Sequence, residues 1–186
     1  MSHSTRTLAF NNWAAEAGWP AVCDPDLVFE DGLLANLHGL WRKQAENGAT
    51  PRRSQMTPRV LKPFLKNIAI FERPSNTPIR YRVRVIGTHL AEALGEMQGK
   101  YLDEVLPAPV VLQWHARLDL TLAEGRPMRF VSRVDARQLY FLRSETFWAP
   151  LASEDEKAPP QILMAANLSF NGEKFAARGH AVAKMI

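Results

Sequence analysis

The chain has 186 residues, of which 46% are hydrophobic and 23% charged, with a formal net charge of +4. These values are ordinary for one globular domain with an extension, and the length can bury a core without disulfides or metal ions. No apolar run reaches the length of about 18 residues that a membrane-spanning helix needs, so no membrane span is expected.

The N-terminal residues and the cysteine content set the expected compartment. The start of the chain lacks the basic residues, apolar stretch and cleavage site of a secretion signal, so a cytoplasmic location is expected. The single cysteine, Cys23, excludes an internal disulfide, a multi-cysteine zinc site and an iron–sulfur cluster. We interpret it as an incidental thiol.

The first predicted element with a clear pattern is a helix over 27–46. Residues up to 26 are expected to be loosely structured, because Pro20 and Pro25 interrupt any long helix. The helix is predicted because apolar residues then recur at helical spacing. They are Leu33, Leu34, Leu37, Leu40 and Trp41. Further along, Thr57 and Pro58 are typical of the start of a short helix.

Two strands are predicted next, over 67–72 and 79–87. The second alternates, with Tyr81, Val83 and Val85 on one face and Arg80, Arg82 and Arg84 on the other. Gly87 ends this strand, and Thr88 is the expected cap of a short helix that stops at Gly95.

The rest of the domain is predicted as one turn of helix, a longer helix and three strands. The turn lies near 102–105, and the helix runs from Pro107 to about residue 124. The strands cover 128–136, 139–153 and 160–170. Strands joined by short loops pair antiparallel. We therefore predict an α+β fold, with a five-stranded antiparallel sheet, helices on one face, and an N-terminal amphipathic helix.

This order of elements resembles a PAS domain. In that fold a turn of the type G-K-x-L-x-E precedes the long helix, and here residues 99–104 read GKYLDE. The chain is also similar to a bacterial family of small stand-alone PAS-like proteins of unknown function, through 51–54, 80–88 and Gly95. The likeness covers about 40 to 170. It implies a PAS-like fold, a sensory role, no catalytic residues and a ligand cavity between sheet and helices.

The expected division of the chain is an N-terminal extension over 1–47, the PAS-like domain over 48–172 and a tail over 173–186.

The resemblance also places a candidate ligand pocket among the apolar residues of the sheet and helices. The same apolar residues are needed for a core in any such fold, and we favour simple packing over a pocket. The candidates are Tyr81, Val83, Val85, Leu90, Leu94, Trp114, Leu118, Phe130 and Met164.

Arginines on the predicted strands indicate a second, charged candidate site. A shared face would form a basic patch for phosphate groups or an acidic partner. The competing interpretation, which we favour, is a solvated face whose arginine stems cover apolar surface. The residues are Arg80, Arg82, Arg84, Arg129, Arg133 and Arg143.

The outer face of the sheet needs a cover, because the later strands are apolar on both faces, as at Phe147 and Trp148. The helix over 27–46 is the candidate, either from the same chain or from a partner. We predict a homodimer with this helix at the interface.

Signatures of cofactors and enzymes are absent from the sequence. We find no haem, flavin or metal signature, and we interpret His115 as a surface or half-buried histidine rather than an axial haem ligand. No G-x-S-x-G, P-loop, G-x-G-x-x-G after a strand, or H-E-x-x-H occurs. The ligand itself stays unknown at this level.

Three functions remain in order of preference. The first is a non-catalytic PAS-type sensory or regulatory module that binds a small molecule or a signalling protein and acts through dimer or partner contacts. The alternative is a protein that binds nucleic acid or a phosphate ligand through the arginine face, with nucleic acid the less favoured partner. An enzyme with an unrecognised site ranks last.

Overall fold

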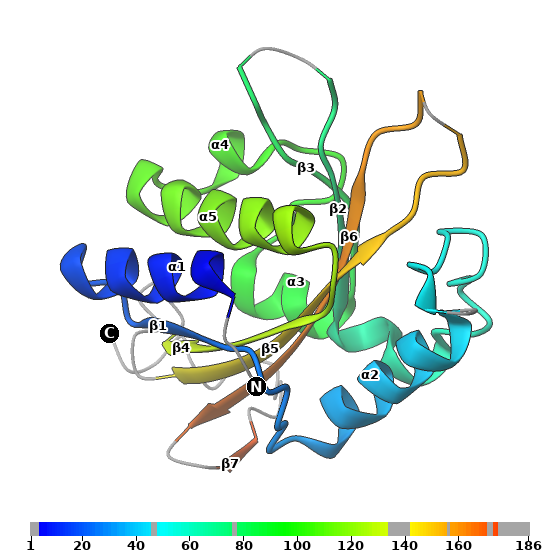
Figure 1. The fold of residues 1–186 in the computed structure, drawn as a ribbon, viewed down its shortest axis with the longest axis horizontal. Helices are drawn as coiled ribbons and strands as arrows, with labels where there is room; N and C mark the ends of the chain where they lie inside the picture. The colour runs from blue at the N-terminus through cyan, green and yellow to red at the C-terminus, as the bar shows by residue number, and fades with distance from the viewer. Residues whose placement is uncertain are drawn as a thin grey trace.

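The computed structural model describes residues 4–45, 48–75, 78–133, 142–155, 157–170 and 173–174. The predicted ends of the strands at 134–136 and 139–141 lie outside these residues. The elements run in the order α1 (Thr5–Glu16), β1 (Ala21–Asp24), α2 (Gly32–Gln44), the 3₁₀ helix η2 (Lys62–Asn67), β2 (Ile68–Glu72), β3 (Arg82–Ile86), α3 (Thr88–Leu94), α4 (Leu102–Val105), α5 (Ala108–Glu124), β4 (Met128–Arg133), β5 (Leu142–Leu151), β6 (Gln161–Phe170) and β7 (Glu173–Lys174) (Figure 1).

All strands of the described residues belong to one antiparallel sheet. Their order is β1-β4-β5-β6-β2-β3, and β7 pairs with β6. The strands β2 to β6 are the five that the sequence predicts, so the α+β fold is confirmed. The sequence interpretation missed β1, which extends the sheet beyond β4, and β7, which lies in the predicted tail.

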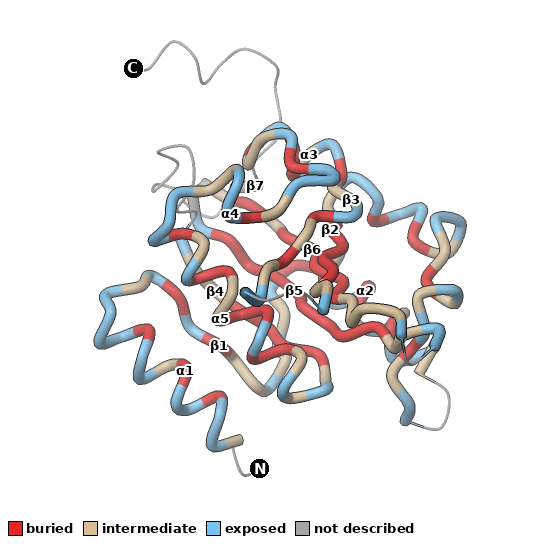
Figure 2. Tube along the Cα trace, turned by 90° about the horizontal axis from the view of Figure 1, so that it is seen from above, coloured by how far each residue is buried: buried red, intermediate tan, exposed pale blue. Residues whose placement is uncertain are grey.

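Helices cover both faces of this sheet. One face packs against α1, α3, α4 and α5 around a core that includes Phe71, Trp148 and Met164. The other face packs against α2 and η2 around Phe147 and Leu163. Figure 2 shows the buried strands running between the two groups of helices (Figure 2).

The cover of the outer sheet face is the chain's own helix, α2. Its residues Leu34, Leu37 and Trp41 are buried in the same core cluster as Phe147. The indole Nε1 of Trp41 donates a hydrogen bond of 3.1 Å to the carbonyl of Pro150 in β5. This resolves the question of whose helix lies there. The homodimer is a separate matter and stays a prediction.

The prediction of a loosely structured N-terminus is wrong. Pro20 lies between α1 and β1, so it separates two elements instead of breaking one. The side chain of Asn11 in α1 accepts a hydrogen bond from Cys23 N at 2.7 Å and donates one to Cys23 O at 2.9 Å. The helix therefore holds β1 in place at the edge of the sheet, where β1 pairs with β4.

The start of α2 lies later than the sequence predicts. The Asp31 side chain accepts hydrogen bonds from Leu33 N at 2.8 Å and Leu34 N at 3.2 Å, so it is the N-cap. Leu27 has a φ of 56°, in the left-handed region, so the backbone there is not helical. The α3 helix likewise begins with Gly87 as its N-cap residue, in place of Thr88.

The strict alternation predicted for β3 breaks at a register shift. Val85 pairs with Ile70, but Val83 pairs with Phe71, which leaves Arg84 as an extra residue in β3. A one-residue shift moves the side chains that follow to the other face. Val83 is consequently buried on the α5 side, whereas Val85 packs on the α2 side.

Candidate functional site

A small cavity lies between the sheet and the helices α3 and α5. Its volume is about 50 Å³. The strands contribute residues from β4, β5 and β6, which are consecutive in the sheet. The described residues that line it are Leu90, Leu94, Val110, Gln113, Trp114, Arg117, Ser132, Arg133, Ser144, Thr146, Trp148, Met164, Ala166 and Leu168.

Aromatic rings form the apolar wall of the cavity. The Trp114 and Trp148 rings meet edge to face with centroids 5.6 Å apart. Phe71 lies against both, stacked on Trp148 at 5.8 Å with an interplanar angle of 10° and edge-on to Trp114 at 5.5 Å. Such mutually packed rings have few alternative rotamers, so this wall is rigid.

Hydroxyl groups of β4 and β5 form a polar strip on the sheet side. The Oγ atoms of Ser132 and Ser144 lie 2.8 Å apart. The indole Nε1 of Trp148 donates to Thr146 Oγ1 at 2.7 Å, and Thr146 Oγ1 donates to the Phe130 carbonyl at 3.2 Å. These hydrogen bonds fix the hydroxyl groups in position beside the cavity.

Two polar residues of α5 line the opposite wall. Gln113 and Arg117 are four residues apart and therefore lie on the same face of the helix. Both are buried, and the exposed fraction of Arg117 is 7%. Arg133, which is exposed, is the second cation among the lining residues. The described lining contains no carboxylate, so its formal charge is positive.

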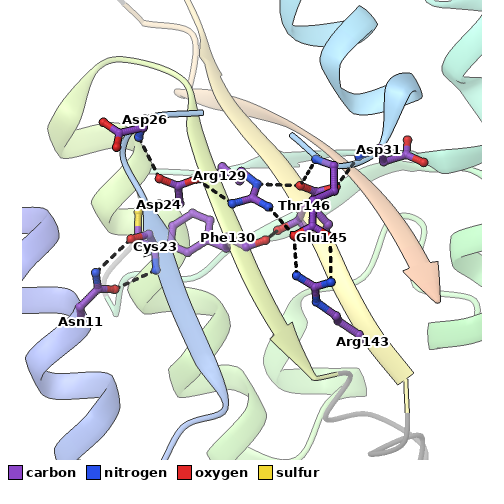
Figure 3. Close-up of polar contacts among 11 residues, drawn as sticks. Asn11, Cys23, Asp24, Asp26, Asp31, Arg129, Phe130, Arg143, Glu145 and Thr146 are labelled. Atoms are coloured by element: carbon purple, nitrogen blue, oxygen red, sulfur yellow. Dashed lines mark hydrogen bonds and ion pairs between the residues drawn. The ribbon is translucent and has the colours of Figure 1, made fainter. Parts of the chain in front are cut away.

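A buried ion-pair network occupies the opposite face of the sheet, between β1, β4 and β5 (Figure 3). Arg129 donates to Glu145 from Nε and to Asp24 from Nη1, both at 2.6 Å. Glu145 also accepts hydrogen bonds from the backbone N–H groups of Glu30 and Asp31, each at 2.8 Å. The network thus ties the segment before α2 to the middle of β5.

The comparison with known families decides the classification. The PAS domain family model matches residues 32–163, which is most of the chain. The chain belongs to the PAS domain family. PAS domains are generally non-catalytic modules with a sensory or regulatory role. A search of curated proteins found no match.

The match to the PAS domain starts at α2 and ends within β6. It includes the cavity-lining residues of α3, α5, β4 and β5, whereas Met164, Ala166 and Leu168 of β6 follow its last residue. The segments α1 and β1 lie before it, although β1 pairs with a strand inside it. No described helix has the length and apolar character required to cross a membrane.

The predicted pocket residues of this PAS domain divide into three groups. Leu90, Leu94, Trp114 and Met164 line the cavity. The remaining candidates on that side of the sheet pack in the surrounding core without being among the lining residues, and they are Tyr81, Val83, Leu118 and Phe130. Val85 packs on the other side, because of the register shift in β3.

Sequence reasoning missed the polar lining residues of the PAS domain. It searched for apolar faces, and Gln113, Arg117, Ser144 and Thr146 do not belong to such a pattern. A usable signal was present in α5. Gln113 and Arg117 flank Trp114 on the buried side of the helix, where polar residues are uncommon unless they have a role.

The candidate arginines do not form one basic patch. Arg129 and Arg143 lie on β4 and β5, and Arg143 donates to both carboxylate oxygens of Glu30 at 2.8 Å. At the other edge, Arg82 and Arg84 on β3 pair with Glu72. Arg80 forms hydrogen bonds with Asp103 and Glu104 and stacks over the Tyr101 ring at 3.8 Å. Of the six arginines predicted from the sequence, Arg133 alone is among the residues that line the cavity.

These ion pairs shift the pKa values of the partners. Hydrogen bonds from Arg80 lower the pKa of Asp103, and the bond from Arg143 lowers the pKa of Glu30. The carboxylates are therefore held in the charged form and neutralise the arginines locally. Arg80 and Arg143 are therefore already bound to carboxylates, and a phosphate ligand would have to compete with them.

The histidine and the cysteine that a cofactor could use are poorly placed for it. His115 lies on α5 with its ring 5.1 Å from the Tyr81 ring, and burial lowers the pKa of His115. It lines a surface groove between α1 and α5, not the cavity. Burial raises the pKa of Cys23 to about 12, which makes the thiol unreactive at neutral pH. Among the described residues, no group of three or more His, Cys, Asp and Glu side chains could hold a metal ion.

Proposed function

We propose that this PAS domain is a sensory or regulatory module that binds a small molecule in the cavity between α5 and the sheet. The observation that supports the proposal is the cavity itself. It has a volume of about 50 Å³, a rigid aromatic wall, and polar groups converging from α5 and from β5. An apolar pocket with a few fixed polar groups is typical of small-molecule sites.

Signalling would use the helices that cover the cavity. A ligand that fits one packing of α3 and α5 better than another shifts the population towards it. Such a shift would reach α1, because Arg6 in α1 donates a hydrogen bond of 3.2 Å to the Ala123 carbonyl of α5. The output would then pass through protein contacts, and we propose that no reaction is catalysed. The cytoplasmic location stays a prediction.

Filling the cavity tests the proposed function. Ala166 on β6 lines the cavity, and valine there adds two carbon atoms in a residue type that strands accept well. We expect Ala166→Val to keep or raise the melting temperature, because the new methyl groups occupy empty space. In native mass spectrometry, the wild type is expected to retain a small molecule above the 21.0 kDa chain mass. The variant is expected to show the bare chain.

The control is Ala116→Val on α5, which lines the groove towards α1 and not the cavity. This variant should retain the same small molecule as the wild type. A wild type that carries nothing, and that is not stabilised by any of a set of small neutral and charged compounds, would contradict the proposal.

The homodimer through the helix around 27–46 is our second proposal for this module. The apolar residues Leu34, Leu37 and Trp41 of α2 are buried against the chain's own sheet. A second copy would therefore have to contact the outer, polar side of α2. We expect twice the chain mass in light scattering at micromolar concentration, and a monomer under these conditions would refute the dimer.

A further inference from the structure

We infer that the chain has a second binding surface, for the phosphate backbone of double-stranded nucleic acid. It lies on the layer formed by the end of α2, the segment that follows it and η2. The cavity is on the opposite side of the sheet, so the inference goes beyond the proposed function and does not depend on it. It is carried by the distribution of charge, by the lack of ion pairs at these cations and by the lack of an apolar anchor.

Positive charge is concentrated in one short stretch of the chain. Residues 42–66 contain seven of the 23 lysines and arginines but one of the 19 acidic residues. This stretch therefore carries a formal charge of +6, whereas the rest of the chain carries −2. Clustered basic residues are the electrostatic footprint of a polyanion site. Six of the seven are exposed and are called the basic surface below: Arg42, Lys43, Arg52, Arg59, Lys62 and Lys66.

The cations of the basic surface belong to one layer of the fold, because the buried residues between them share one core. Trp41, Met56, Leu61 and Phe64 all pack in the cluster on the α2 side of the sheet. The exposed side chains between these anchors consequently lie on the outer surface of that layer. Figure 1 shows α2 and the cyan segment that follows it on one side of the molecule, away from α1 and α5.

Hydrogen bonds hold the segment between α2 and η2 in place. Ala152 N donates to the Pro51 carbonyl at 2.8 Å, which ties the segment to the end of β5. The guanidinium of Arg53, the seventh cation, donates from Nη1 to the Met56 carbonyl at 2.6 Å. A backbone that is already ordered reduces the conformational entropy lost on binding an extended ligand.

The cations of the basic surface differ from the arginines of the sheet in their partners. Arg82, Arg84, Arg129 and Arg143 all form ion pairs with carboxylates. None of the six cations of the basic surface forms an ion pair with a carboxylate that the structure describes. A phosphate group at this surface therefore displaces no carboxylate among the described residues.

The composition of the basic surface separates the polyanions that could bind there. In the described part of 42–66, the one large exposed apolar side chain is Leu65, and the one aromatic ring, that of Phe64, is buried. Protein interfaces rely on apolar or aromatic anchors, and stable attachment to a membrane takes an apolar anchor beside the basic residues. Single strands bind through bases that stack on exposed rings. The backbone of a duplex requires cations alone, so a duplex fits this surface best.

Fluorescence anisotropy of a labelled DNA duplex, titrated with the full chain, tests the inference. A duplex of about 20 base pairs is expected to bind at low salt. Its affinity should fall about 10²- to 10³-fold between about 50 and 200 mM salt, because about four to six phosphate contacts release counterions. A second duplex of different sequence should bind within about threefold of the first, since backbone contacts carry no sequence information.

Charge variants locate the contact on the basic surface. Lys62→Gln is expected to reduce the slope of the logarithm of the association constant against the logarithm of salt concentration by about 1. The matched control is Lys100→Gln, which removes an exposed lysine before α4, outside the basic surface, and should leave the slope unchanged. The triple variant Arg59→Gln, Lys62→Gln and Lys66→Gln should weaken binding at about 50 mM salt by at least about 30-fold.

Competition experiments separate the duplex from other partners. The competitors are the single strand of the same sequence, a peptide of about 15 glutamates, and vesicles that contain phosphatidylserine, each at the same concentration of negative charge. Each is expected to displace the labelled duplex less effectively than the unlabelled duplex does. A competitor that is more effective would overturn nucleic acid as the partner of this surface.

The outcomes also separate this inference from the proposed function. No duplex binding at about 50 mM salt, or a triple variant that binds like the wild type, would overturn the inference and leave the small-molecule module intact. Ala166→Val, which fills the cavity, should bind the duplex as the wild type does. A loss of duplex binding in Ala166→Val would contradict the independence of the two sites.

Discussion

Replacement of Gly87 by alanine is expected to lower the free energy of unfolding by roughly 3 kcal/mol or more. A Cβ at this position would lie 2.1 Å from the Leu65 carbonyl oxygen and 2.5 Å from the Lys66 carbonyl oxygen. Both obstacles are backbone atoms of η2, so no side-chain rotation can relieve the overlap. Gly87 is also held in place from the other side, because its N–H donates to the Ile68 carbonyl at 2.8 Å.

The relief of this overlap requires η2 to move away from the junction between β3 and α3. Urea denaturation followed by circular dichroism measures the loss of unfolding free energy. In thermal unfolding, we expect the same loss to lower the melting temperature by about 6–12 °C. The matched control is Gly39→Ala, in an exposed position of α2 with no atom within 4 Å of the new Cβ. It should gain about 0.5–1 kcal/mol, because alanine is the better helix former. Equal effects of the two changes would refute the close approach at Gly87.

The second large effect on the free energy of unfolding is expected from replacing Arg129, the buried arginine of the ion-pair network. Arg129→Leu is expected to cost about 3–5 kcal/mol, because it leaves a buried carboxylate without its cation. Arg129 and Glu145 are 7% and 6% exposed, and each has its partner at 2.6 Å. The change also removes the bond to Asp24, and with it a link between β4 and β1.

The control for this change is Arg143→Leu. Arg143 lies two residues from Glu145 on the same strand and forms an ion pair with Glu30, but both side chains are largely exposed. Its loss should cost about 0–1 kcal/mol. Guanidinium denaturation of both variants, monitored by tryptophan fluorescence, compares them directly. A cost for Arg129→Leu below that for Arg143→Leu would show that the buried pair does not stabilise the fold.

The chain order of the central strands, and the antiparallel pairing of those joined by short loops, could be predicted from the sequence because their signals are local. The pairing of β2 with β6 could not be, because these strands are far apart along the chain. Alternation at Tyr81 and Val83 and the apolar run around Met164 are visible without any knowledge of the fold. The helix α1 escaped because its buried residues are Thr7, Phe10 and Ala14, of which only Phe10 is strongly apolar. The register shift at Arg84 escaped because it depends on how β3 pairs with β2.

The site was less predictable than the fold, for a physical reason. A core is built from apolar residues, and the pattern that locates them cannot distinguish a filled core from one with a gap. Trp114 and Leu118 are one turn apart on α5 and both buried, yet only Trp114 lines the cavity. The charged contacts of Arg129 were equally hidden, because Arg129 is 105 residues from Asp24 and 16 residues from Glu145 along the chain.

The strand β5 is a wall shared by two interiors of the domain. Its residues Ser144, Thr146 and Trp148 line the cavity, and the residues between them, Glu145 and Phe147, lie on the α2 side. The carboxylate of Glu145 holds the two backbone N–H groups that precede α2. A molecule in the cavity is thus one strand's thickness away from the anchor of a helix on the far side. Any displacement of β5 towards or away from α5 also moves the Glu145 carboxylate and the backbone N–H groups bound to it. A change on one face of the sheet therefore reaches the other face through β5 itself, without a chain of intermediate residues.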